Sequence, residues 1–445
     1  MKVDIKKLGV NGEGIGFYQK KPVFVDRTIP NETVTVKPNI ETHSYIKADL
    51  IHIETPSVQR RIPLCKYFER CGGCDIQHIN YQAQLTYKKD HLVQSLHKYM
   101  DKKLEDDVIG DMIGSRKEIG YRNKAQLPIR DVKGIPRFGL FRRNSNQMLP
   151  VSHCPVQHPL INKVMTQTID LMQKHHIKAY LPSKRTGLIK GLMARVGHDT
   201  DALQLVFELT KKDELKQLIT SLIKMNQDII SIYITINSDP KKQIYVNETT
   251  TCIYGEETID AMLAGYTYQL YPQSFFQLNS TVAVEFYETM MQLAKLKSTD
   301  IIVDCYAGLA TISHMAARFI KKGIAIEINP KAAINARMSL DKNNIHNIKV
   351  ITGDAFSVLK QMKEKVDVIF FDPPRTGLGD KMLHLLSKIK LKKIVYGSCN
   401  PSTLAKDLNI LSKDYDIKKV IPLDMFPQTA QVESVTLLTL KKTKF

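Results

Sequence analysis

Cys399 stands at a point of the chain where a thiol could act as a nucleophile. Residues 392–396 have an apolar, β-branched middle that predicts a short buried strand, and the segment Gly397-Ser-Cys-Asn-Pro401 follows it directly. Proline cannot donate to a ladder and disfavours helix at the residue before it, so the chain must turn here. Cys399 is therefore expected at the carboxyl end of a strand, the edge where open α/β sheets bind ligands. A buried structural thiol is the alternative interpretation.

Four other cysteines have the spacing of metal ligands. Cys65, Cys71 and Cys74 lie close together, and Cys154 precedes a proline much later in the chain. The first residues lack a signal-peptide core, so we expect a cytoplasmic, reducing location where such thiols bind metal rather than form disulfides. Four thiolates suit zinc or an iron–sulfur cluster. One tight pair, a wider gap and a remote cysteine before proline favour the cluster over the paired spacing of zinc sites.

Acidic residues end successive strands in the last part of the chain. The strand 301–304 leads into a small-residue turn with a single glycine, Gly308, and the next strand ends in Glu327. A carboxylate at that position binds ribose hydroxyls, as in Rossmann-like sheets. The turn lacks G-x-G-x-x-G, so S-adenosylmethionine, which has no phosphates, fits better than a dinucleotide. Asp354 follows the third strand and could meet the adenine, and Asp372 follows the fourth, where a flat base beside a methyl donor is often held.

The last strand brings another carboxylate to the same edge. Residues 420–424 and 434–440 have the pattern of strands, and the short loop between them favours a hairpin. The final strand should then run antiparallel, and Glu433 at its beginning should lie where the parallel strands end. A surface charge is the alternative interpretation of Glu433. Beside Cys399, however, this carboxylate would give a thiol and a base next to a methyl donor.

The length and charge of the chain indicate several domains and a polyanionic partner. A chain of 445 residues is too long for one core, and 64 Lys and Arg against 45 Asp and Glu leave +19, which favours a polyanionic partner. The sequence has no run of about 18 uncharged apolar residues, so no membrane span is predicted. The predicted fold class is α/β. It has an oligonucleotide-binding-like β-barrel over 1–58, a central mixed α/β region with the four cysteines over 59–260, and a Rossmann-like methyltransferase domain over 261–445.

Taken together, these motifs resemble those of the RNA uracil-C5 methyltransferases. Among them the chain is most similar to the 23S ribosomal RNA (uracil-5-)-methyltransferases with an amino-terminal TRAM domain and a [4Fe–4S] cluster. The likeness covers essentially the whole chain and rests on 397–401, on Phe-Pro-Gln-Thr-Ala-Gln-Val-Glu over 426–433, and on 273–279 and 372–375. It implies S-adenosylmethionine contacts from Gln277, Tyr306, Glu327, Asp354 and Asp372, and cluster ligands Cys65, Cys71, Cys74 and Cys154.

The resemblance implies methyl transfer to C5 of uridine in 23S ribosomal RNA. Uracil C5 is a poor nucleophile, and addition of the Cys399 thiolate to C6 would make it enolate-like. Glu433 would then remove the C5 proton so that the thiol can leave. The target base must leave its stack to enter the pocket. The cluster would serve structure or RNA positioning rather than redox chemistry, and neither a membrane nor an obligate protein partner is implied.

The chain departs from the family pattern at two places. Ala307 and Ala310 stand where the first cofactor turn usually has a cysteine and a second glycine, and Gln431 stands where histidine is often found. Alternatives therefore stay open: the same chemistry on transfer RNA, RNA cytosine C5 methylation, or an RNA-binding protein with an inactive methyltransferase domain. The familiar bacterial enzymes that methylate transfer RNA lack both the barrel and the four cysteines, and this argues against the transfer-RNA alternative. The sequence leaves open which uridine is modified, at how many sites, and the oligomeric state.

Overall fold

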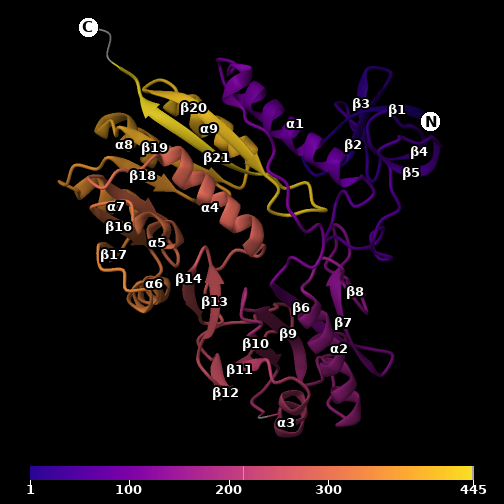
Figure 1. Cartoon of the computed structure of the whole chain (residues 1–445). Helices are drawn as coiled ribbons and strands as arrows, with labels where there is room; N and C mark the ends of the chain where they lie inside the picture. Colours follow the sequence, from indigo (N-terminus) through magenta and orange to yellow (C-terminus); the bar gives the residue numbers. More distant parts are fainter. Residues whose placement is uncertain (214, 443–445) are drawn as a thin grey trace.

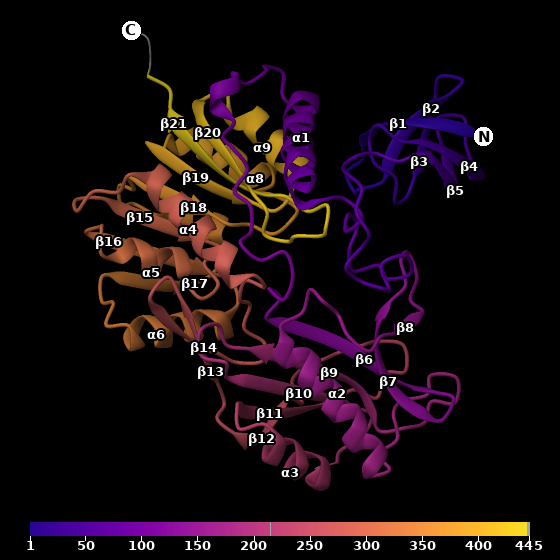
Figure 2. The same ribbon diagram turned by 45° about the vertical axis from the view of Figure 1, so that its right-hand side comes forward.

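The chain folds into an amino-terminal barrel, a central sheet and a carboxyl-terminal α/β sheet (Figure 1). The computed structural model describes residues 1–213 and 215–442. Across those two ranges, none of the helices combines the length and the apolar character needed to cross a bilayer. Turned by 45°, the molecule shows the barrel standing beside the other two parts, joined to them by the violet segment that follows it (Figure 2).

The first five strands close into the barrel that the glycine and proline punctuation predicted. They are β1 (Lys2–Leu8), β2 (Gly14–Tyr18), β3 (Lys21–Val25), β4 (Thr33–Glu41) and β5 (Ile46–Thr55). The order is β1-β2-β3-β5-β4, and β4 pairs with β1 to complete the ring. Alternate apolar residues such as Val3, Ile5, Val23, Val25 and Val34 point inward and form a core of their own, separate from the other cores.

The central part is a seven-stranded sheet with helices packed on it. Its order is β12-β11-β10-β9-β6-β7-β8, and only β10 and β11 are parallel within it. Helices α2 and α3 share one apolar core with these strands. The elements are β6 (Lys124–Val132), β7 (Ile135–Phe141), β8 (Met148–Pro150), α2 (Pro159–Lys174), β9 (Ile189–Val196), β10 (Leu203–Leu209), α3 (Lys216–Met225), β11 (Ile229–Ile236) and β12 (Thr251–Gly255).

The carboxyl-terminal sheet has the order β17-β16-β15-β18-β19-β21-β20, as expected for a Rossmann-like methyltransferase. Its first five strands are parallel, and β21 runs antiparallel to both β19 and β20, which confirms the predicted hairpin. The strands are β15 (Ile301–Cys305), β16 (Lys322–Glu327), β17 (Ile348–Thr352), β18 (Val368–Phe371), β19 (Lys393–Ser398), β20 (Tyr415–Leu423) and β21 (Glu433–Leu440), preceded by the hairpin β13 (Ile259–Leu263) and β14 (Tyr266–Leu270).

Helices cover both faces of this sheet because successive residues of its buried strands point to opposite sides. Phe370 of β18 joins the core under α4 and α5, whereas Phe371 joins the core under α8 and α9. The helices are α4 (Ser280–Ala294), α5 (Thr311–Ala317), α6 (Pro330–Lys342), α7 (Ala355–Gln361), α8 (Asp380–Ile389) and α9 (Pro401–Leu411).

An early helix, α1 (Tyr81–Tyr99), belongs by its packing to the carboxyl-terminal sheet. Leu92 and Leu96 share a core with Leu404 and Leu408 of α9, and both views show the two helices side by side. A short 3₁₀ turn, η1 (Asp106–Val108), follows, and the chain then runs along β20. Helix α1 and the 3₁₀ turn lie within the predicted central region, 59–260, by their place in the sequence. In space they pack against the carboxyl-terminal sheet.

Candidate active site at the carboxyl edge of the sheet

A thiol and a carboxylate lie at adjoining ends of paired strands. β19 and β21 are antiparallel, with Ser398 opposite Ser434. Cys399 follows β19 directly and Glu433 begins β21. One residue beyond the Ser398–Ser434 pair, Cys399 and Glu433 therefore lie at the same edge of the sheet. Asp372 directly follows β18, the other neighbour of β19, and adds a second carboxylate. The hairpin topology thus gathers residues that are far apart in sequence.

The turn into α9 presents Cys399 to this edge. Asn400 caps the helix, since its side-chain oxygen accepts a hydrogen bond from the backbone N–H of Ser402 at 3.0 Å. Pro401 occupies the first helical position, where its missing N–H is no loss. The Asn400 side-chain amide donates to the carbonyl oxygen of Arg375 at 3.3 Å and ties the Asp-Pro-Pro-Arg segment to the cysteine turn. The amino-terminal end of α9 partly offsets the burial that disfavours a thiolate at half-buried Cys399.

Gly397 lets α4 approach the end of β19 closely. A Cβ atom at this position would lie 2.6 Å from the end of the Met290 side chain and 2.6 Å from the ring of Phe286. Both side chains are buried in the core between α4 and the sheet, so neither has free space to move into. The glycine of the cysteine motif therefore has a packing role that the sequence did not reveal.

Burial dominates the electrostatics of the pair. It raises the pKa of the Cys399 thiol to about 11, with further increases from the carboxylates of Glu433 and Asp372 and an opposing effect of Arg375. Burial also raises the pKa of Glu433 to about 8, helped by Asp372 and opposed by Arg375 and Lys88. Glu433 is therefore largely protonated at neutral pH, and this neutral form repels the Cys399 thiolate less than an ionised carboxylate would. When ionised, it is a stronger base than an ordinary glutamate.

The predicted cofactor turn keeps its shape despite its alanines. Tyr306, Gly308 and Ala310 all have positive φ, at 62°, 55° and 58°. Such a conformation costs a residue with a Cβ atom about 1–2 kcal/mol. Ala310 is fully buried among other alanines, including Ala325, so its small side chain packs where a larger one would clash. The departure from glycine thus leaves the left-handed turn in place.

The acid at the end of the second strand fastens this turn. One carboxylate oxygen of Glu327 accepts from the backbone N–H of Gly308 at 2.8 Å, and the other accepts from Asn329 at 2.7 Å. Asp354 caps α7 through the backbone N–H of Ser357 and is exposed on its other side. Each carboxylate oxygen has a second lone pair, so both acids can still accept from ribose or adenine groups.

Two residues beside the turn add to the site. The side chain of Gln277, which precedes α4, interacts with the buried hydroxyl of Tyr287. Asp304 at the end of β15 is fully buried, and burial raises its pKa to about 7. One of its oxygens accepts from the Ser313 hydroxyl at 2.8 Å, and the other has no partner. Asp304 is the last residue of the predicted strand 301–304, and this unpaired oxygen makes it a candidate site residue.

The four predicted metal ligands surround one cavity. Cys65, Cys71, Cys74 and Cys154 all line a space of about 200 Å³ between the segment after the barrel and the central sheet. In the described parts of the chain, no three His, Cys, Asp or Glu side chains are close enough together to hold a single metal ion. Gln77 donates to the Cys74 sulfur at 3.2 Å and accepts from the backbone N–H of Cys65 at 3.1 Å. All four cysteines thus border the same space.

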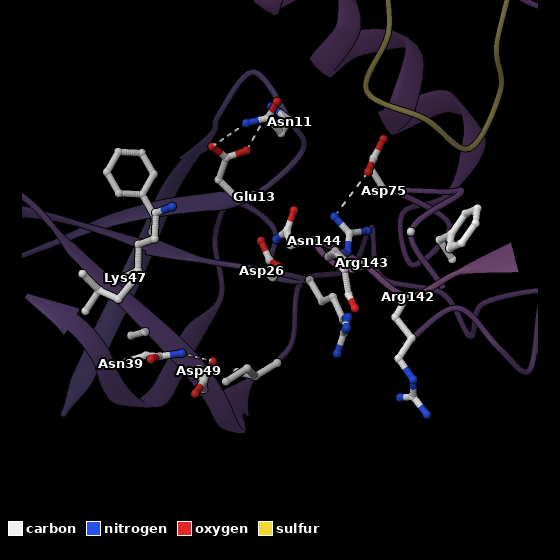
Figure 3. A pocket seen from close by; sticks show the side chains of 18 of the residues that line it. Asn11, Glu13, Asp26, Asn39, Lys47, Asp49, Asp75, Arg142, Arg143 and Asn144 are labelled. Carbon is white, nitrogen blue, oxygen red and sulfur yellow. Dashed lines mark hydrogen bonds and ion pairs between the residues drawn. The ribbon is translucent and has the colours of Figure 1, made fainter. Parts of the chain in front are cut away.

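A large groove lies between the barrel and the turn after β7. Figure 3 shows barrel residues such as Lys47 on one side and Arg142 and Arg143 on the other. The groove encloses about 1240 Å³, and aromatic side chains including Phe141 also line it. Arg143 pairs with Asp75 at 3.3 Å, and both residues line the groove. Basic and aromatic residues from two parts of the molecule therefore share one surface.

Comparisons with known proteins agree on one family. A family model described as tRNA (uracil-5-)-methyltransferase matches residues 80–441. An uncharacterized RNA methyltransferase of Enterococcus faecalis is 35% identical over 442 residues, which are 98% of this chain and 97% of that protein. Another uncharacterized RNA methyltransferase, from Listeria innocua, is 36% identical over 443 residues, covering 98% of this chain and 96% of that protein.

A solved structure extends the likeness to the whole fold. The Pyrococcus abyssi tRNA (uracil-54, C5)-methyltransferase in complex with S-adenosyl-L-homocysteine is 25% identical with a TM-score of 0.79. The match covers 99% of this chain and 100% of that one, so it includes the barrel. A barrel at the amino terminus therefore does not by itself separate ribosomal-RNA from transfer-RNA enzymes. The chain belongs to the tRNA (uracil-5-)-methyltransferase family of S-adenosylmethionine-dependent RNA methyltransferases.

Proposed function

We propose that the chain transfers the methyl group of S-adenosylmethionine to C5 of uridine in 23S ribosomal RNA, with Cys399 as nucleophile and Glu433 as base. The observation that carries this proposal is the register of β19 and β21, which brings these two side chains to one edge beside Asp372. Transfer RNA is the second candidate substrate. It is favoured by the full-length likeness to the Pyrococcus abyssi enzyme, which is a transfer-RNA methyltransferase.

The proposed reaction balances without a redox step. The Cys399 thiolate forms a bond to C6 of uracil, and the electrons of the C5–C6 double bond move toward C5 and O4. C5 then bonds to the methyl carbon, while the pair of the broken sulfur–methyl bond stays on the sulfur of S-adenosylhomocysteine. Glu433 takes the remaining proton from C5, the C5–C6 double bond re-forms, and Cys399 leaves as thiolate. The uridine gains a methyl group and loses one proton.

We assign the methyl donor to the turn after β15 and the strand ends beside it. Glu327 would accept from the ribose hydroxyls, and Asp354 would meet the adenine. Gln277, Tyr306 and Asp372 would hold the methionine end beside Cys399. Support comes from the left-handed turn and from the exposed edge of Asp354, which leave backbone and carboxylate groups available at the carboxyl ends of the strands.

The RNA would run through the groove between the barrel and the turn after β7. Its acidic side chains are partly engaged, since Asn39 donates to Asp49 at 3.4 Å and Arg143 to Asp75 at 3.3 Å. Arg142 and Lys47 remain to meet phosphates, and Phe141 offers a face on which a base can stack.

We further propose that Cys65, Cys71, Cys74 and Cys154 hold a [4Fe–4S] cluster. Each iron of such a cluster takes its own thiolate, so the four sulfurs surround the cluster rather than one ion. Support comes from the cavity that all four cysteines line together. The cluster would join the segment after the barrel to the central sheet and thereby stabilise both.

Iron analysis tests this assignment. Protein purified without oxygen should be brown and contain about four iron and four sulfide ions per chain. Cys74→Ala should lose both the colour and the iron. Stoichiometric zinc without iron in the same preparation would refute the cluster.

Trapping the covalent intermediate tests the chemistry. Fluorine at C5 cannot leave as a cation, so RNA with 5-fluorouridine should stay bound to Cys399 as a heat-stable band on a denaturing gel. Glu433→Gln should give the same band with ordinary RNA and carry the transferred methyl label, because the C5 proton cannot leave. Cys399→Ala should give no band with either RNA. A band from Cys399→Ala would mean that another residue is the nucleophile.

Mapping 5-methyluridine in a strain lacking the protein decides between the substrates. Loss from 23S ribosomal RNA supports the first candidate, whereas loss confined to transfer RNA supports the second. Unchanged modification of both would contradict the proposed function.

A further inference from the structure

The loop that carries Glu433 to the sheet edge is held largely from outside its own hairpin. This base loop, residues 424–432, joins β20 to β21, and both views show it reaching the violet segment after the barrel (Figures 1 and 2). Lys88 of α1 forms a buried ion pair with Asp424 and donates to the carbonyl oxygen of Phe426 at 3.0 Å. Helix α1 therefore grips the loop where it leaves β20.

Gln428 is the centre of the base loop. It is 0% exposed, and its backbone has a φ of 74° in the left-handed region. A residue with a Cβ atom keeps this conformation only where its surroundings impose it. Such imposed backbone strain is common at functional sites, and here it lies five residues before the proposed base.

Three separate segments satisfy the side chain of Gln428. Its oxygen accepts from Gln84 of α1 at 3.0 Å and from Arg61 at 2.9 Å. Its amide nitrogen donates to the carboxylate of Glu118 at 3.1 Å. Gln84, itself fully buried, returns the contact by accepting from the backbone N–H of Gln428 at 3.1 Å. Donor and acceptor are both specified, so an isosteric carboxylate would not fit.

The backbone of the loop is joined to the cysteine segment. The carbonyl oxygen of Gln428 accepts from the backbone N–H groups of Asp75 at 2.9 Å and Ile76 at 3.1 Å. The Asp75 carboxylate accepts from the backbone N–H of Ala430 at 3.2 Å. Asp75 directly follows Cys74, so the segment that lines the cysteine cavity also fixes the path of the loop.

We propose that Gln428 is a positioning residue, through which α1, Glu118 and the cysteine segment set the position of Glu433 relative to Cys399. The proposal rests on the proposed roles of Cys399 and Glu433. Cys399 is held independently, by β19 and the cap of α9. A displaced base loop therefore moves the base and leaves the nucleophile in place. The step that suffers is proton removal from C5, and the preceding addition and methyl transfer continue.

The test exchanges donor and acceptor within the buried pair. Gln428→Glu places a carboxylate against that of Glu118, and a base displaced by about 1 Å should slow turnover about 100-fold. Single-turnover methyl transfer and S-adenosylmethionine binding should stay within about twofold of wild type, so the methylated covalent adduct accumulates on a denaturing gel. Gln428→Glu combined with Glu118→Gln restores one donor facing one acceptor beside Arg61. Turnover should recover at least about tenfold and the adduct should disappear.

A second variant covers the case in which Gln428→Glu fails to fold. Gln84→Ala removes the buried partner and should also accumulate adduct, whereas Gln82→Ala, on the exposed side of the same helix, should not. Wild-type adduct levels in Gln428→Glu and Gln84→Ala would overturn the proposal. So would an equal loss of cofactor binding, methyl transfer and release with a lowered Tm, because that is the signature of a merely structural residue.

Two control variants distinguish a failure of the positioning role from a failure of the proposed function. Glu433→Gln in parallel reports whether blocked proton removal traps an adduct at all, and Cys399→Ala in the Gln428→Glu background must abolish any band. If Glu433→Gln traps nothing, the role of Glu433 is wrong. If it traps adduct and the Gln428 and Gln84 variants do not, only the positioning role is wrong.

Discussion

At the scale of single residues, the edge of the sheet gathers buried carboxyl groups, and the folded state favours their protonated form. Burial raises the pKa of Asp304 to about 7, of Asp372 to about 6 and of Glu433 to about 8. A catalytic base with a pKa near the working pH is useful, since it accepts a proton readily and can release it again. The same burial makes the ionised site costly, because each charge loses water without gaining a full partner.

We therefore predict that Glu433→Gln makes the protein more stable in alkaline solution. The folded-state pKa of Glu433 is raised, so its contribution to stability is fully present below the ordinary pKa of about 4.5 and is lost as pH rises through about 8. The neutral amide does not ionise and avoids this loss. Thermal unfolding should show a Tm at least about 2 °C above wild type at pH 9 and little difference at pH 4. An equal gain at both values would place the effect elsewhere than in ionisation.

At the scale of elements, the catalytic turn depends on how closely α4 packs against β19. Asn279 caps α4 and also donates to the carbonyl oxygen of Met425 at 3.0 Å, so this helix touches the base loop at one end. Farther along, Phe286 and Met290 press on Gly397. One helix thus contacts both β19, which precedes Cys399, and the base loop, which precedes Glu433.

Gly397→Ala should push α4 away from the end of β19. The added methyl group would clash with Met290 and Phe286, which should destabilise the fold by about 1–3 kcal/mol and slow adduct formation with 5-fluorouridine RNA. Met290→Ala removes one of the two clashes, so its combination with Gly397→Ala should be less harmful than the sum of the single changes. Additive losses in denaturant unfolding would show that the two positions do not interact.

At the scale of the whole molecule, RNA binding and cofactor binding are built from different parts. The barrel has its own core, whereas the proposed cofactor residues all lie after residue 270. Between them lies the groove of Figure 3, with walls from the barrel and from the turn after β7. Removal of the barrel would leave only one of those walls.

A chain without residues 1–58 should therefore bind RNA at least about tenfold more weakly, because stacking and phosphate contacts of one groove wall are lost. Its Kd for S-adenosylmethionine should change by less than about twofold, which calorimetry can measure. Phe141→Ala and Arg142→Ala in the full chain should each weaken RNA binding in the same direction. Equal loss of cofactor and RNA binding in the shortened chain would mean that the barrel supports the catalytic core.

The sequence by itself determined the local elements and the chemistry that they present. Proline after Asn400 forces a turn, and a short loop between two apolar runs forces a hairpin, so the placement of Cys399 and Glu433 at one edge follows from local rules. A small amino-terminal barrel and a Rossmann-like sheet follow from turn residues and strand periodicity in the same way, whereas the number of barrel strands comes from the structure. Roles for the site residues remain proposals that rest on this geometry.

Only the tertiary structure decided which distant segments hold that edge in place. Gln84 occupies one position of a helix with a weakly apolar face, and nothing in its neighbours distinguishes it from exposed Gln82. Its partner, Gln428, is 344 residues away, and pairing over such a distance leaves no local pattern. The same holds for the buried ion pair of Lys88 and Asp424. Secondary structure depends on neighbours along the chain, whereas buried polar partners are fixed only when remote segments pack and must satisfy each other's hydrogen bonds.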